Sequence, residues 1–231
     1  MRVLLTIAYI LLCCGLSATD YYVDFTLGDD DNNGLTPQTA WKTAGKVRSV
    51  NNQVGPGDRF LFKRGETWPA SRIYYTESGT AGNPIIFSDY GNPSLPLPVI
   101  SAIGSIPGAA DPANWTTTGN SIWALVLPYS PSRLLLNGDE ALRSNTLVEL
   151  GQPDNVGAVG VWFYDLDNQL LLVFSPSNPA INFASIEGGI APAALQLDGC
   201  TGITIENIEF QGGRVASLQL FGAQHISLIN C

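Results

Sequence analysis

The chain carries an internal repeat with a period of 23 residues near its C-terminal end, and no other feature limits its fold as much. Residues 195–208, LQLDGCTGITIENI, align with residues 218–231, LQLFGAQHISLINC. Each copy has two short runs of alternating apolar residues with turn-forming residues between them. This pattern is typical of a solenoid coil, which buries its apolar face only against neighbouring coils. Leucine-rich repeats share the period, but their leucine and asparagine register differs and one side is often helical. The repeat therefore predicts an all-β fold, a parallel β-helix.

The register of the repeat also places single side chains. Asn207 and Asn230 occupy equivalent positions, where stacked amides can hydrogen-bond along the axis of the coil. Ordinary turn asparagines are the alternative. Cys200 and Cys231 fall at different positions of the coil, so no disulfide is expected between them, and Cys231 is expected in an inward apolar place. The sequence stops within a coil, which would leave unpaired strand edges, so we expect the natural protein to continue with further coils.

The N-terminal part of the chain combines a short strand, an acidic turn and a predicted helix. Residues 21–25 alternate as a strand does, and the turn GDDDNNG follows at residues 28–34. Thr36 and Pro37 are typical of a helix start, so a helix is predicted from there to about Val50. Its apolar stripe would consist of Ala40, Trp41, Ala44 and Val47.

Further short runs rich in β-branched and aromatic residues lie between turn formers. They predict strands at residues 59–63, 85–88 and 99–101. From about residue 111 the chain becomes rich in aromatic residues, which indicates an inserted β subdomain with strands at residues 121–127, 133–137 and 169–174. The predicted organisation is a signal peptide (1–18), a cap with the first coils (19–110), the insertion (111–185) and regular coils (186–231).

The first 18 residues have the pattern of a secretory signal peptide. Arg2 precedes an apolar run at residues 3–12, which is too short for a membrane span, and small residues lead to a predicted cleavage site near Ala18. A lipid anchor at Cys13 is the alternative, but Leu12 before it is not small. The sequence therefore predicts a secreted protein, extracellular or periplasmic, without a membrane span.

Acidic residues outnumber basic ones by 20 to 11, and the formal net charge is −9. Such a surface repels nucleic acid, so no nucleic-acid partner is expected. It would also repel an acidic polysaccharide unless basic residues were gathered in one place, and most of them do fall between Lys42 and Arg72. A solvated cap surface is the simpler explanation of this cluster.

Several motifs resemble the N-terminal cap of secreted right-handed parallel β-helix repeat proteins, in the pectate lyase-like superfamily that includes polysaccharide lyases. They are Tyr22-Val-Asp, GDDDNNGLTPQTAWKT, PGDRFLFKRGETW and SGTAGNPIIFSDYG, and the similarity continues through the insertion into the regular coils. The resemblance implies a fold that serves pectate, alginate and chondroitin lyases, glycoside hydrolases and epimerases. It also places their catalytic residues and calcium sites on later coils, beyond Cys231. No catalytic residue is therefore carried over to this chain.

The turn before the predicted helix copies the first half of a calcium loop. Asp29, Asp31 and Asn33 would supply oxygen ligands at alternate positions. The closing glutamate is missing, because Ala40 stands in its position, so a complete site would need Asp24 or a distant carboxylate. The alternative without metal is a turn in which Asp and Asn side chains bond the local backbone. Calcium is the one cofactor that the sequence suggests.

Side chains suited to hydrolysis are sparse. His225 is the only histidine, which argues against a serine–histidine–aspartate triad. Paired carboxylates could support glycoside hydrolysis, and Glu206 with Glu209, or Asp165 with Asp167, are candidates by type. Solvated carboxylates on strands and turns are much commoner than catalytic pairs.

Other candidates concern lyase chemistry and sugar binding. A lyase needs a base and a cation beside a uronate, and Arg214 is the only basic residue on the regular coils. A surface role is its alternative. Trp115 and Trp123 are candidates for stacking on sugar rings, whereas Trp41 and Trp68 are expected in the core.

Two functions follow from these observations. The first is the N-terminal part of a secreted enzyme of lyase or glycoside hydrolase type that acts on extracellular polysaccharide. Its catalytic coils would be missing from this chain, which would then be inactive by itself. The second is a non-catalytic β-helix of the cell surface with a glycan-binding, adhesive or structural role. Charged groups converging on later coils would favour the enzyme.

Overall fold

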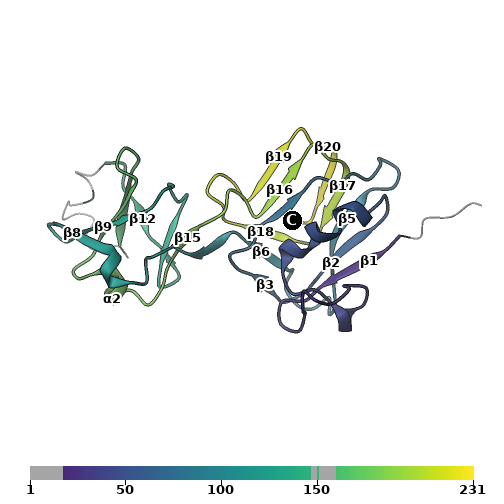
Figure 1. Ribbon diagram of the computed structural model, residues 1–231, viewed down its shortest axis with the longest axis horizontal. Coiled ribbons are helices and arrows are strands. Elements are labelled where there is room, and N and C mark those ends of the chain that lie inside the picture. Colours follow the sequence, from purple (N-terminus) through teal and green to yellow (C-terminus); the bar gives the residue numbers. More distant parts are fainter. Residues whose placement is uncertain (1–17, 147–149, 151–159) are drawn as a thin grey trace, which may run out of the picture.

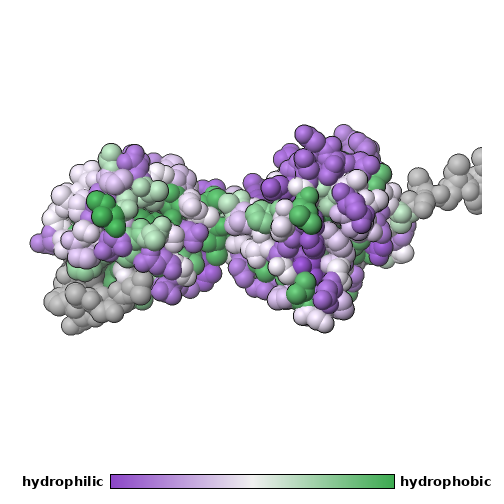
Figure 2. All heavy atoms as spheres, turned by 90° about the horizontal axis from the view of Figure 1, so that it is seen from below, coloured by the Kyte–Doolittle hydropathy of each residue, from purple (hydrophilic) through white to green (hydrophobic). Residues whose placement is uncertain are grey.

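The computed structural model describes residues 18–146, 150 and 160–231, and its regular structure is almost entirely β. Two rounded lobes are joined by a narrower connection (Figures 1 and 2). In the described ranges, no helix has the length and apolar character that a membrane crossing requires. The predicted all-β fold class is confirmed. The predicted signal peptide lies, except for Ala18, outside the described residues.

Three parallel sheets build one lobe, which we call the parallel lobe (residues 18–102 and 190–231). From β2 onward the chain visits these sheets in a fixed order, first, second and third, and then begins again. Every neighbouring pair of strands in them is parallel. The first sheet contains β1 (Asp20–Val23), β2 (Arg59–Lys63), β5 (Ile85–Tyr90), β17 (Thr201–Glu206) and β20 (Gln224–Ile229); the second contains β3 (Thr67–Trp68), β6 (Val99–Ser101) and β18 (Glu209–Gln211); the third contains β4 (Ile73–Tyr75), β16 (Leu195–Asp198) and β19 (Leu218–Phe221).

The strand register reproduces the sequence repeat. Leu195 of β16 pairs with Leu218 of β19, and Ile203 of β17 pairs with Ile226 of β20. The same spacing between strands therefore holds on two different sheets. It brings equivalent apolar side chains into rows along the lobe, as the repeat predicted.

The turn asparagines and the cysteines test the register further. Asn230 Nδ2 donates to Asn207 Oδ1 at 2.8 Å, and both residues have a left-handed backbone with φ of 51° and 56°. The predicted stacking of the two amides is confirmed. Cys200 and Cys231 are both free, also as predicted, but Cys231 is exposed. Its expected burial is wrong in this structure: the equivalent Ile208 is buried, but β20 is an edge strand, and no described strand lies beyond it to cover Cys231.

A single hydrophobic cluster fills the parallel lobe. Its largest members come from all three sheets and include Phe60, Phe87, Trp68 and Tyr75, which are fully buried. Phe60 packs edge to face on Tyr75 with ring centroids 5.7 Å apart, and it lies 5.0 Å from Phe87. The core thus joins strands that are far apart in the sequence.

The predicted continuous helix from Thr36 to Val50 is wrong. Thr36 does cap a helical turn, but this is the short 3-10 turn η1 (Pro37–Thr39), and a second 3-10 segment, η2 (Ala44–Gln53), follows after a break. At the break the Trp41 backbone N–H donates to Tyr22 O of β1 at 2.9 Å, so this stretch pairs with a strand instead of continuing the helix. The predicted apolar stripe is nevertheless buried: Ala40, Trp41, Ala44 and Val47.

The middle of the chain forms the second lobe, which we call the antiparallel lobe (residues 103–189 of the described ranges). All its strand pairs are antiparallel except β12 with β13. It has hydrophobic clusters of its own, separate from that of the parallel lobe. Its elements are β7 (Ile103–Ser105), η3 (Pro112–Asn114), β8 (Trp115–Gly119), β9 (Ile122–Val126), β10 (Leu134–Leu136), β11 (Asp139–Glu140), β12 (Leu142–Arg143), β13 (Val161–Asp165), β14 (Leu170–Phe174), α2 (Pro179–Asn182) and β15 (Ile186–Gly189).

Candidate functional site

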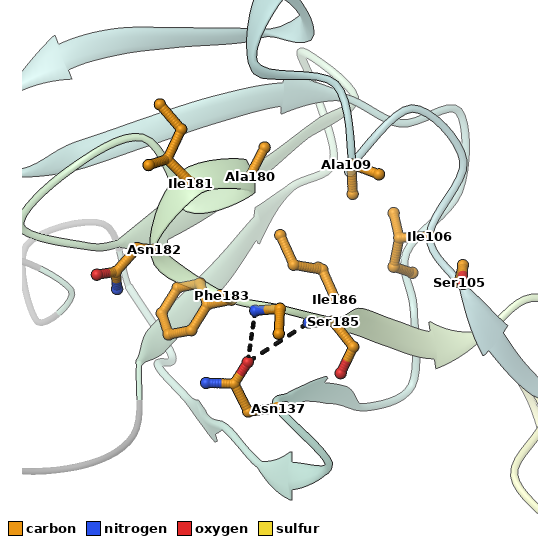
Figure 3. A pocket seen from close by; sticks show the side chains of 12 residues that line it. Ser105, Ile106, Ala109, Asn137, Ala180, Ile181, Asn182, Phe183, Ser185 and Ile186 are labelled. Atoms are coloured by element: carbon orange, nitrogen blue, oxygen red, sulfur yellow. Dashed lines mark hydrogen bonds between the residues drawn. The ribbon is translucent and has the colours of Figure 1, made fainter.

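A cavity of about 710 Å³ opens on the antiparallel lobe, where α2 and the start of β15 face the segment that follows β7 (Figure 3). Its floor is apolar, because Ile106, Ala109 and Ile186 are buried there. Phe183 and Ala180 are half-buried at its wall. The remaining lining residues are small, polar or exposed: Ser105, Ala110, Asn137, Ile181, Asn182, Ala184 and Ser185.

The walls of the cavity are held together by Asn178 at the N-terminus of α2. Its Oδ1 accepts from the backbone N–H of Ala180 at 3.1 Å and so caps the helix. Its Nδ2 donates to Pro112 O of η3 at 2.9 Å. One side chain thus both caps α2, which lines the cavity, and fastens it to η3.

Asn137 lies at the other end of the cavity, in the turn between β10 and β11. Its φ is 56°, a left-handed conformation that asparagine tolerates. Its Oδ1 accepts from the backbone N–H groups of Ala184 at 2.7 Å and Ser185 at 3.4 Å. Because two donors face this oxygen, they fix the orientation of the amide. Nδ2 points away from these two donors (Figure 3).

The electrostatic character of the cavity is simple. Among the described residues that line it, none is Asp, Glu, Lys, Arg or His. An anion entering it would lose water without gaining a cation, which is costly in a partly apolar site. The cavity is therefore suited to uncharged groups that combine apolar surface with hydroxyl or amide groups.

Arg214, the predicted lyase cation, lies where the two lobes meet. Its guanidinium carbon is 4.5 Å from the centre of the Tyr129 ring, and its Nε is buried without a hydrogen-bond partner. Burial raises the pKa of the Tyr129 hydroxyl, while the nearby Arg214 charge opposes that shift. Close by, Ser132 Oγ donates to Gly213 O across the same contact. This arrangement packs the arginine between the lobes.

The predicted calcium turn is closed by its own hydrogen bonds. Asp29 Oδ1 accepts from the Asp31 N–H at 3.0 Å, and Asn33 Oδ1 accepts from the Leu35 N–H at 3.0 Å. Both Asp24 oxygens also have partners, including Lys63 Nζ at 2.8 Å. Within the described ranges, no group of three or more His, Cys, Asp or Glu side chains is arranged to hold a metal. These contacts match the metal-free alternative, and calcium at Asp29, Asp31 and Asn33 stays a prediction.

The candidate carboxylate pairs are not brought together. Asp165 Oδ1 accepts from the backbone N–H groups of Asp167 and Asn168, both at 3.1 Å, so it closes a turn. The Asn168 side chain and these N–H groups lower the pKa of Asp165. Glu206 lies on β17 and accepts from Ser88 Oγ at 3.0 Å, whereas Glu209 lies on β18 of another sheet. Neither pair has the common face that a glycosidase dyad needs.

The aromatic and histidine candidates also have structural partners. Trp115 is buried, and its Nε1 donates to Ala109 O at 2.9 Å, so its expected exposure is wrong. Trp123 is half-buried and donates to Ser175 O at 3.2 Å. His225 Nδ1 lies 3.2 Å from Thr201 Oγ1. Sugar stacking on Trp115 has no open ring face in this structure, and stacking on Trp123 stays a prediction.

The basic cluster between Lys42 and Arg72 is spread over separate contacts. Arg59 pairs with Asp20 at 2.6 Å, Lys63 with Asp24 at 2.8 Å, and Arg64 with Asp89. Arg48 and Arg72 both stack on the Tyr74 ring, at 4.9 and 5.3 Å from its centre. The cations therefore form no single site for an acidic polysaccharide among the residues that the structure describes.

The cavity residues were not found from the sequence, because three separate segments build the cavity. Residues 105–110, Asn137 and residues 180–186 meet only through strand pairing within the antiparallel lobe. One usable signal was present: Asn137-Gly138 marks a tight hairpin turn, which would have placed Asn137 at a loop tip.

Comparison with known proteins gives a local sequence match and a match of fold. No protein-family model matches the chain. It is 35% identical over 89 residues to lacto-N-biosidase from Bifidobacterium longum subsp. longum, a match that covers 38% of this chain and 6% of that protein. The chain thus spans a small part of the curated relative that it matches.

Solved structures give the second comparison. XylC in complex with xylose superposes with a TM-score of 0.54 at 16% identity, over 81% of this chain and 34% of that chain. GH136 lacto-N-biosidase from Eubacterium ramulus gives a TM-score of 0.40 at 21% identity, over 84% of this chain and 21% of that one. The likeness to XylC shows that this chain shares a fold with part of that protein.

Proposed function

We propose that the chain is part of a secreted, carbohydrate-active protein of glycoside hydrolase type. The observation that carries this proposal is the 35% identity with lacto-N-biosidase over 89 residues. The shared fold with part of XylC, whose structure holds xylose, supports it. Because the matched stretches cover only part of these proteins, the chemistry is assigned to the whole gene product and not to this chain alone.

The proposed scaffold is a right-handed parallel β-helix. Three observations support it: the repeating order of the three sheets, the parallel pairing of every strand within them, and the Asn207–Asn230 step at equivalent corners. Each coil would contribute one strand to each sheet. Residues 19–102 and 190–231 would form the coils, and residues 103–189 would be an insertion between β6 and β16, because β7 and β15 pair with each other in the antiparallel lobe.

A hydrolytic role is preferred to a lyase role because the sequence match is to lacto-N-biosidase. The cations of this chain add no support for a lyase. Arg214 packs on Tyr129, and the cations of the N-terminal coils are paired or stacked on Tyr74. A lyase must stabilise a uronate carboxylate with a positive group near its base. No such arrangement occurs within residues 18–146, 150 and 160–231.

The test is an activity assay on the secreted gene product that contains this chain. Neutral oligosaccharides, including lacto-N-biose and xylose glycosides, and polygalacturonate are offered separately. We expect new reducing ends from a neutral glycan and no ultraviolet-absorbing unsaturated uronate from polygalacturonate. Release of unsaturated uronate would replace the hydrolase by a lyase. Absence of any cleavage would leave the non-catalytic, glycan-binding role.

A further inference from the structure

We propose that the cavity of the antiparallel lobe is a binding site for one neutral sugar residue. The inference rests on the proposed function, which supplies the glycan, and it adds the place and the chemical class of the contact. The cavity has a volume of about 710 Å³. Ligand sites commonly measure about 300 to 1,000 Å³, so a sugar ring with its substituents can enter.

The lining fits the two faces of a pyranose. The apolar floor formed by Ile106, Ala109 and Ile186 can cover ring C–H groups. Of the lining residues that the structure describes, Phe183 alone is aromatic, and its half-buried ring stands beside that floor (Figure 3). Aromatic and aliphatic side chains of this kind bury the apolar face of a sugar, while its hydroxyl groups stay near the rim.

Asn137 provides a hydrogen-bond donor that is already oriented. The Ala184 and Ser185 N–H groups hold its Oδ1 on one side, which leaves Nδ2 as the free end of the amide. A sugar hydroxyl or carbonyl oxygen can accept from this nitrogen. Since the amide is fixed before binding, little conformational entropy is lost when the hydrogen bond forms.

The absence of charged side chains among the described lining residues determines which class of sugar the cavity can bind. A uronate or sulfated sugar would bring an anion to a cavity whose described lining residues include no basic side chain. Such a ligand would pay for desolvation without an ion pair in return. The geometry therefore points to a neutral hexose, pentose or N-acetylated sugar.

The test measures binding of four probes to the purified chain by calorimetry or NMR titration: galactose, xylose, N-acetylglucosamine and galacturonate. Ala184→Trp places a large ring at the exposed rim, where the native methyl group is not part of the buried core. Its matched control is Ala113→Trp, which adds the same ring at an exposed position of η3 outside the lining.

We expect at least one neutral sugar to bind saturably, at least tenfold more tightly than galacturonate. Ala184→Trp should weaken that binding at least tenfold, and Ala113→Trp should leave it within about twofold. Asn137→Asp tests the donor separately, because it keeps the accepting oxygen but removes Nδ2; it should weaken binding several-fold.

Three results would overturn the inference. Neutral-sugar binding that Ala184→Trp does not change would place the sugar elsewhere on the chain, and the proposed function would stand. Equal binding of galacturonate would contradict the neutral class. If the chain binds none of the probes while the whole gene product still cleaves a neutral glycan, only this site is refuted; if neither occurs, the proposed function fails with it.

Discussion

The two lobes bury apolar surface in different ways. In the parallel lobe, strands from distant parts of the sequence stack into one core, and rows of equivalent side chains repeat from strand to strand. In the antiparallel lobe, hairpin pairs such as β8–β9 and β13–β14 occur beside long-range pairs such as β7–β15, and the core is divided into two clusters. The first arrangement is regular. The second has irregular connections, and these form the cavity.

The two lobes also differ in the ion pairs that the structure describes. The described ion pairs of the parallel lobe are Arg59–Asp20, Lys63–Asp24, Lys63–Glu66 and Arg64–Asp89, and those with Asp24 and Asp89 involve carboxylates that are largely shielded from solvent. The antiparallel lobe has the exposed pair Arg133–Glu140. We infer that these ion pairs help to hold the parallel lobe rigid as a scaffold. The antiparallel lobe then provides the surface that binds the sugar.

The greatest loss of stability is predicted for a substitution that affects the hydrophobic core of one lobe and not that of the other. Phe87→Ala removes a fully buried ring from the parallel lobe and should lower its free energy of unfolding by about 3 to 5 kcal/mol. Ile86→Ala, at the half-buried neighbouring position of the same strand, should cost less than half as much. Hydrogen exchange during urea unfolding reports each lobe separately. Equal loss of protection in both lobes with Phe87→Ala would show that they unfold as one unit.

A smaller loss of stability is expected at the turn where Asn207 and Asn230 stack in the parallel lobe. Asn207→Ala loses the hydrogen bond to Asn230 and forces alanine into a left-handed conformation, which should cost about 1 to 2 kcal/mol. Asn207→Gly loses the same bond but accepts the backbone conformation, so it should cost less. Chemical denaturation checks both. If the two variants are equally unstable, the backbone conformation contributes nothing here.

The contact between Arg214 and Tyr129, which joins the two lobes, should contribute less to stability than the Asn207 corner. Arg214→Ala removes the guanidinium from the Tyr129 ring and should destabilise the junction by about 1 kcal/mol. Arg214→Lys should recover part of this. Limited proteolysis near the junction is expected to speed up in the alanine variant, while core hydrogen exchange in each lobe stays unchanged. Unchanged proteolysis would mean that Arg214 does not hold the lobes together.

The smallest effect concerns pH. Burial pushes the pKa of Asp24 upward, but the hydrogen bond from Lys63 and that from the Leu27 N–H outweigh it, so the pKa lies below its usual value. Ionised Asp24 therefore stabilises the fold above the ordinary pKa of about 3.9, and this stabilisation is lost as the pH falls through the lowered native pKa. Asp24→Asn should flatten this part of the pH profile of thermal unfolding for the parallel lobe. An unchanged slope would remove Asp24 as its cause.

The sequence predicted the regular lobe well, because its pattern is periodic. Residues 59–63 and 99–101 are strands at the predicted bounds, and the repeat predicted which leucines and isoleucines pair. The helix from Thr36 failed because the Trp41 backbone pairs with β1, a contact that no local propensity contains. Tertiary pairing overrode a correct capping signal.

The candidate site could not be predicted in the same way. Trp115 and Arg214 were chosen by residue type, yet one is buried against Ala109 and the other packs on Tyr129. The cavity depends on Asn137 meeting residues 184 and 185, more than forty positions later in the chain. The described residues that line the cavity form no sequence motif. What they share is the absence of a charged side chain, and an absence gives no pattern to find in a sequence.

In our proposal the parallel lobe is the scaffold and the antiparallel lobe contacts the sugar. Ser105 of β7 pairs with Glu187 of β15, so residues 106–186 can be replaced by an Asn-Gly turn that closes a two-residue hairpin. Calorimetric titration of this shortened chain with the neutral sugar that binds the intact chain tests the claim directly. We predict that the shortened chain unfolds cooperatively and no longer binds the sugar. Retained binding would contradict the assignment of sugar contact to the antiparallel lobe. Loss of cooperative folding would contradict the role of the parallel lobe as the scaffold.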